Sequence, residues 1–103
     1  MSKEGARIHT FMHKLEIDHP QQDQIVNSPI YTFRVDGPET LASLEVAVDR
    51  GQWHACRRAC GYWWYDWAGY GEGEHILVAR GQNRDGSPIG STPRRFTVSL
   101  RKP

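Results

Sequence analysis

Hydrophobic and polar side chains alternate along much of this chain, which is the pattern of strands that bury one side. The segment "IYTFRV" at 30–35 places Tyr31, Phe33 and Val35 on one side, with Thr32 and Arg34 on the other. Further segments of this kind are "KLEI" at 14–17, "LEVAV" at 44–48, "WHACR" at 53–57, "YWWYDW" at 62–67 and "RRFTVSL" at 94–100. The pattern therefore predicts short strands along most of the chain.

Turn-forming residues separate these segments. "DRGQ" at 49–52 predicts a hairpin turn and "GYGEG" at 69–73 a second turn. "EHILVAR" at 74–80 is almost continuously apolar and predicts a central strand, whereas "GQNRDGSPIGSTP" at 81–93 predicts a long connection. Short strands at this spacing predict an all-β fold, an immunoglobulin-like antiparallel β-sandwich of about seven strands.

The inward positions of these strands define an expected core. Its members are Leu15, Ile17, Tyr31, Phe33, Val35, Leu44, Val46, Val48, Trp63, Tyr65, Trp67, Leu77, Phe96 and Val98. Hydrophobic residues make up only 38% of the chain, but aromatic residues make up 11%. Because each buried aromatic side chain removes roughly 150–250 Å² from water, a few large groups are enough for such a core.

The first thirteen residues are the least regular part of the sequence. Ile8, Phe11, Met12 and Leu15 follow the spacing of one helix face, but no capping residue directly precedes Ile8 and strand-like sequence follows. We expect residues 1–13 to form an irregular lead-in and residues 14–103 to form the sandwich domain. A short N-terminal helix is the alternative.

Composition narrows the classes of function. The net charge is +1, from 13 basic and 12 acidic side chains, which argues against nucleic-acid binding through bulk charge. No apolar run reaches the ~20 residues of a membrane span, so no membrane insertion is expected. The N-terminus lacks the apolar stretch of a signal peptide, which predicts a cytoplasmic protein unless the chain is a module of an exported one.

The ordered motifs "SLEVAVDRGQWHAC", "YWWYDW", "GEGEHILVARGQNRDG" and "FTVSL" resemble bacterial immunoglobulin-like sandwich modules. They are also similar, at the level of the fold, to the dimerisation domain of molybdenum-cofactor oxidoreductases. The resemblance covers about residues 14–100 and implies a non-catalytic spacer, adhesive or interaction module without a cofactor. Its partner would be another protein, a domain of a longer parent chain, or a second copy. "CRRAC" and Gly81 depart from the pattern.

The aromatic segment at 62–67 splits between two sides of a strand. Asp66 should face solvent, because a buried unpaired carboxylate is costly, and Tyr62 and Trp64 share its side. The other three aromatic side chains then point into the core: Trp63, Tyr65 and Trp67.

Tyr62 and Trp64, with Arg57 and Arg58 close by in sequence, form the candidate binding site. Such a group can stack on a partner's side chain or on a carbohydrate. Packing of Trp64 against its own sheet is the alternative.

Cysteines and histidines suggest three further alternatives. A metal site would need His54, Cys56, Cys60 and His75, whose spacing matches no strong template. A Cys56–Cys60 disulfide requires a tight turn between the two residues, and otherwise both thiols stay reduced. A cysteine nucleophile would need a lowered thiol pKa and an oxyanion site, and the sequence shows no such constellation, so we expect no enzyme.

Overall fold

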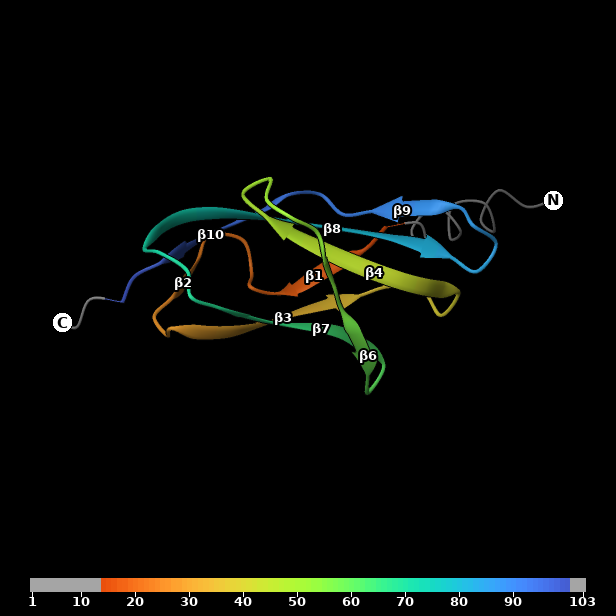
Figure 1. Cartoon of the computed structure of the whole chain (residues 1–103), viewed down its shortest axis with the longest axis horizontal. Helices are drawn as coiled ribbons and strands as arrows, with labels where there is room; N and C mark the ends of the chain where they lie inside the picture. The colour runs from red at the N-terminus through yellow and green to blue at the C-terminus, as the bar shows by residue number, and fades with distance from the viewer. Residues whose placement is uncertain (1–13, 101–103) are drawn as a thin grey trace.

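The computed structural model describes residues 14–100 and shows two β-sheets packed face to face (Figure 1). The predicted lead-in at 1–13 and its helical alternative lie outside the described residues. The described part contains no helix of the length and apolarity needed to span a bilayer. Its ten strands are β1 (Glu16–His19), β2 (Gln24–Val26), β3 (Ile30–Asp36), β4 (Leu41–Val48), β5 (His54–Ala55), β6 (Arg57–Ala59), β7 (Tyr62–Ala68), β8 (Gly73–Asn83), β9 (Pro88–Gly90) and β10 (Arg94–Val98).

The strands form two sheets that we name by their central strands. The β3–β7 sheet has the order β1-β3-β7-β6, and the β8–β4 sheet has the order β2-β10-β8-β4-β5, with β9 also paired to β8. All pairs of strands are antiparallel except β2 and β10, which run parallel. The prediction of an all-β sandwich is therefore confirmed.

The expected count of about seven strands is too low, because the sequence pattern merged or overlooked three short strands. "WHACR" is not one strand: β5 pairs with β4, β6 pairs with β7, and Cys56 lies at the crossing between the sheets. The predicted long connection at 81–93 instead contains the end of β8 and all of β9. The Asp85 carboxylate accepts hydrogen bonds from the backbone N–H and the hydroxyl of Ser87, and these bonds stabilise the turn between β8 and β9.

The predicted core is confirmed as the space between the sheets. Each of its members is buried or packs against the buried cluster. The sequence missed four residues of that cluster: Val26, Leu41, Ala79 and Ile89. Three of these lie in segments that the hydrophobic pattern did not assign to strands, and Ala79 is too small to stand out in an apolar run.

Gly81 occupies the point where β8 passes an irregularity in β4. The register of the two strands shifts between Leu41 and Ser43. A Cβ atom on Gly81 would lie 2.5 Å from the backbone oxygen of Ser43 and 3.0 Å from a methyl group of Leu41. The backbones therefore approach each other here too closely for any side chain.

We predict that Gly81→Ala destabilises the fold by about 1–3 kcal/mol, the range for overpacking a closed site. Gly90→Ala is the matched control, because its Cβ would meet Ala79 at an ordinary 3.7 Å. Urea unfolding of the two variants and the wild type measures the difference. Equal stability of both variants would contradict the steric account.

Candidate functional site

The outer face of the β3–β7 sheet carries the predicted aromatic pair. Tyr62 and Trp64 both project from β7 on the side away from the core, as predicted, and their ring centroids are 6.1 Å apart in an edge-to-face arrangement. Arg34 of β3 and Arg57 of β6 are the cross-strand neighbours of Trp64. We name these four residues the arginine–aromatic face.

Contacts within this face hold its side chains in place. The guanidinium carbon of Arg34 lies 4.3 Å from the centre of the Tyr62 ring, a cation–π contact. Trp64 donates its indole Nε1–H to the backbone oxygen of Ala59 at 2.8 Å. Both aromatic side chains are half-buried. The face is therefore an ordered surface, and part of its aromatic area is already covered by Arg34.

Acidic residues neutralise both arginines of the face. Arg34 Nε lies 3.3 Å from Asp18 Oδ2 without hydrogen-bond geometry, so that attraction is ionic. Arg57 Nη1 lies 3.4 Å from Asp66 Oδ2. A hydrogen bond from the Thr32 hydroxyl, together with the charge of Arg57, lowers the pKa of Asp66. Because the Arg57–Asp66 pair is largely exposed, it contributes little to stability.

Arg58 does not belong to the outward set in which the sequence placed it. It pairs with Trp63, whose side chain points inward, and its guanidinium carbon lies 5.7 Å from the centre of that ring. Successive residues of a strand face opposite sides, so Arg57 and Arg58 cannot share a face once β6 is extended. Nearness in sequence was the wrong criterion for this residue.

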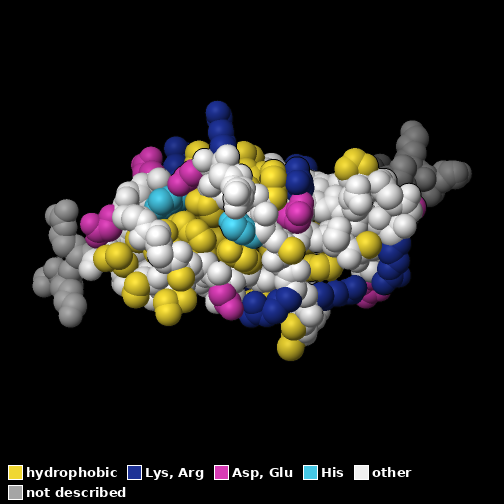
Figure 2. All heavy atoms as spheres, in the orientation of Figure 1, with side chains coloured by type: hydrophobic (Ala, Val, Ile, Leu, Met, Phe, Trp, Pro, Cys, Tyr) yellow, Lys and Arg dark blue, Asp and Glu magenta, His cyan; other side chains and the backbone are white. Residues whose placement is uncertain are grey.

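Arg34 is the member of the face that the sequence analysis missed. Its outward position in "IYTFRV" was predicted, but nothing in the sequence says that β3 pairs with β7 so that Arg34 meets Tyr62 and Trp64. Figure 2 shows the consequence in space: Lys and Arg side chains line the lower edge of the view, over β7 and β6, beside hydrophobic side chains.

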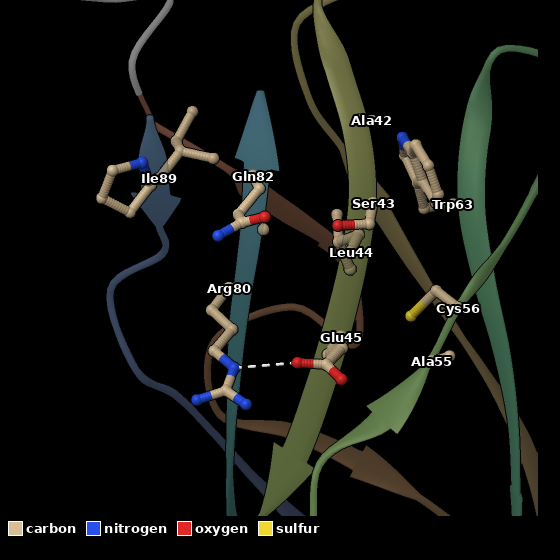
Figure 3. Close-up of a pocket in the computed structure, with 12 residues that line it drawn as sticks. Ala42, Ser43, Leu44, Glu45, Ala55, Cys56, Trp63, Arg80, Gln82 and Ile89 are labelled. Atoms are coloured by element: carbon tan, nitrogen blue, oxygen red, sulfur yellow. Dashed lines mark hydrogen bonds and ion pairs between the residues drawn. The ribbon is translucent and has the colours of Figure 1, made fainter. Parts of the chain in front are cut away.

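A groove of about 630 Å³ is lined mainly by β4, β8 and β9 of the other sheet, and it reaches Cys56 and Trp63. Figure 3 shows Glu45 and Arg80 joined by an ion pair of 2.9 Å on one side of β4, with Cys56 and Trp63 beyond the other side. The carboxylate and the guanidinium neutralise each other, so neither is an isolated charge available to a ligand.

Cys56 is not a nucleophile in this environment. Burial raises the pKa of its thiol to about 12, and the nearby Glu45 carboxylate adds to the shift. Arg57 acts in the opposite direction but does not offset the burial. The nucleophile alternative requires a lowered thiol pKa, and the structure shows the reverse for Cys56.

The two cysteines stay apart because β6 lies between them. Four residues of extended chain span roughly 13 Å, whereas a disulfide needs Cα atoms within about 7 Å. Both thiols are free: Cys56 is half-buried and Cys60 is exposed. The disulfide alternative is not realised, and the tight turn falls at Cys60-Gly61, where both residues have positive φ.

The histidines of the metal alternative also lie apart. His54 stacks on Tyr65 with ring centroids 5.0 Å apart, and His75 is bonded to Asp49. Within residues 14–100 no group of three or more His, Cys, Asp or Glu side chains could hold a metal ion. His9 and His13, whose spacing of four residues could hold a metal ion only on a helix, lie outside the described residues.

We predict that a thiol reagent at about pH 8 modifies Cys60 quickly and leaves Cys56 unmodified until the protein unfolds, because only the thiolate reacts. Mass spectrometry of the labelled chain gives the number and position of adducts. The Cys60→Ser variant serves as the control and should take no rapid label. Two rapid adducts on the native wild type would contradict the burial of Cys56.

Comparisons with known proteins support the fold and no more than the fold. No protein-family model and no curated protein matches the sequence. Solved structures do match. The fibronectin(III)-like modules of Clostridium thermocellum CbhA match with a TM-score of 0.72 and 15% identity, over 86% of this chain and 99% of that one.

An engineered protein of known structure also matches, with a TM-score of 0.69 and 20% identity. The match covers 84% of this chain but only 20% of the engineered one. At these identities the likeness concerns architecture alone. The chain therefore has the two-sheet fold of fibronectin type III-like and immunoglobulin-like modules.

Proposed function

We propose that this chain is a non-catalytic module that stands in series within a longer, bacterial protein and makes protein contacts through its arginine–aromatic face. The observation that carries the proposal is the position of the two ends of the described chain. They lie at opposite ends of the sandwich, near β9 and near β10 (Figure 1). Chain that enters at one end and leaves at the other suits a spacer between domains.

Hydrogen bonds fix both ends. Leu15 donates its backbone N–H to Gly90 of β9, which pairs with Arg80 near the far end of β8. Leu100 donates its backbone N–H to Glu72, immediately before β8 begins. The seven residue-to-residue steps from Gly73 to Arg80 separate the two positions by roughly 24 Å at about 3.4 Å per step along a strand.

The likeness to the CbhA modules supports a modular role, because this chain matches nearly the whole length of one such unit. The chemistry of the described residues agrees. The half-buried thiol is protonated at ordinary pH, and the charged side chains of the groove pair with each other. A spacer or contact domain needs none of these groups to react.

A head-to-tail tandem of two copies tests the serial arrangement. We predict that it is extended, with a maximum dimension in small-angle X-ray scattering close to twice that of one copy. Each copy should unfold at the midpoint of the single chain, because Lys14 and Leu100, the first and last described residues, are both exposed. A tandem no longer than a side-by-side pair, or with a lowered midpoint, would contradict the proposal.

The arginine–aromatic face is the proposed contact surface because it combines ordered aromatic rings with arginines, the residue types enriched where interfaces gain their binding energy. The partner that we propose for this face is a second copy of the chain. Sedimentation equilibrium at micromolar concentration should show self-association of the wild type. Arg57→Glu should weaken this association by about tenfold, because it reverses a charge on the contact surface and places a second carboxylate beside Asp66.

Arg58→Glu is the matched control, because Arg58 is adjacent and exposed but faces the other side of β6. It should leave association unchanged. Equal effects of the two variants, or a monomeric wild type at every concentration, would count against self-association through this face.

Carbohydrate binding is the second proposal for the same surface. Trp64→Ala should then abolish binding to a glycan array. Trp53→Ala, which removes an exposed tryptophan stacked under Arg80, is the control and should retain that binding.

A further inference from the structure

His75 is held at both nitrogen atoms of its ring. Nδ1 lies 2.7 Å from Asp49 Oδ2, and Nε2 lies 2.8 Å from the backbone oxygen of Gly71. Asp49 belongs to the turn after β4, and Gly71 belongs to the loop before β8. The side chain of His75 is only 12% exposed, whereas the Asp49 carboxylate is 49% exposed, so the ring is largely buried while its acidic partner reaches water. We name the three residues the His75 clasp.

Both partners of the ring are hydrogen-bond acceptors. A carboxylate and a backbone carbonyl have no proton to give, whereas a neutral imidazole carries one N–H and one lone pair. Neutral His75 therefore makes one of the two bonds and points a lone pair at the other oxygen. Only the doubly protonated imidazolium donates to Asp49 and Gly71 together.

The surroundings of His75 leave Asp49 as its one charged contact. The rings of Trp67 and Phe96 pack against the imidazole at centroid distances of 5.2 and 5.6 Å. Tyr70 stacks on Trp67, and its hydroxyl donates to the backbone oxygen of Ser28. Among charged neighbours in sequence, Arg50 and Glu74 are exposed, and Glu72 accepts the Leu100 N–H.

The clasp connects to the last described residue of the chain. Gly71, whose oxygen faces Nε2, directly precedes Glu72, and the Glu72 side chain accepts the backbone N–H of Leu100. Asp49 is held independently, because its Oδ1 accepts the N–H of Ile76 and its own N–H donates to the oxygen of Ile76. Loss of a ring bond therefore releases the Gly71–Glu72 loop more readily than the Asp49 turn.

We propose that the His75 clasp is a pH-sensitive device that fastens the Gly71–Glu72 loop, and with it the exit of the chain at Leu100. Protonation of His75 completes both bonds. The neutral ring has one N–H for these two acceptors, so acidic conditions add a bond that the neutral ring cannot donate. A module in series would then hold its following segment more firmly in mildly acidic surroundings.

Thermal unfolding at about pH 5.5 and about pH 8, which bracket the usual range of histidine titration, tests the clasp. Relative to His75→Gln, the wild type should gain roughly 4–8 °C in Tm on going from pH 8 to pH 5.5. His54→Gln is the matched control, because His54 is also half-buried and packs on an aromatic ring. A wild type and His75→Gln with parallel pH profiles would overturn the proposal.

NMR provides a local readout that overall stability does not. In the wild type, the Leu100 amide resonance should titrate together with the His75 ring, and both ring nitrogens should be protonated at the acid end. Asp49→Asn keeps the turn, since Asn tolerates the positive φ of 54° at this position, but removes the charge. The Asp49→Asn variant should reduce the pH-dependent shift that the Leu100 amide resonance shares with the His75 ring. A wild-type Leu100 amide resonance that does not change with pH together with the His75 ring would overturn the proposal.

Discussion

Packing of aromatic rings between the two sheets is the interaction on which the rest of the structure depends. Phe33 of the β3–β7 sheet and Phe96 of the β8–β4 sheet are both fully buried and meet edge to face at 6.0 Å. Trp67 lies within 5.5 Å of both rings. Phe33 and Phe96 are the largest fully buried side chains of the described residues, so their sizes influence how the sheets stack.

This packing also decides what the outer surface presents. Because Trp63, Tyr65 and Trp67 of β7 are drawn inward, the strand pleat sends Tyr62, Trp64 and Asp66 outward. A shift of one residue in the pairing of β3 with β7 would bury Asp66 and expose the core aromatics, so burial fixes the register. The arginine–aromatic face is thus a consequence of the core as much as a feature of the surface.

The two flanks of the sandwich are closed in a similar way, by chain that changes sheets. On one flank the chain passes from β1 to β2, and Arg94 donates to the backbone oxygens of Ile17 and Pro20 there. On the other flank it passes from β5 to β6 at Cys56. That second crossing covers only part of the edge of β4, which is why the groove lies beside it.

The sequence by itself determined the fold class, most of the core and the division of the β7 aromatics between two faces. These follow from alternation, a local property that burial enforces along each strand. Only the tertiary structure decided which residues meet across strands: Arg34 with Tyr62, Arg58 with Trp63, and His75 with Asp49. Such contacts depend on register and on the points where the chain changes sheets, as at Cys56. No local pattern encodes these, because they arise only when both sheets close on one core.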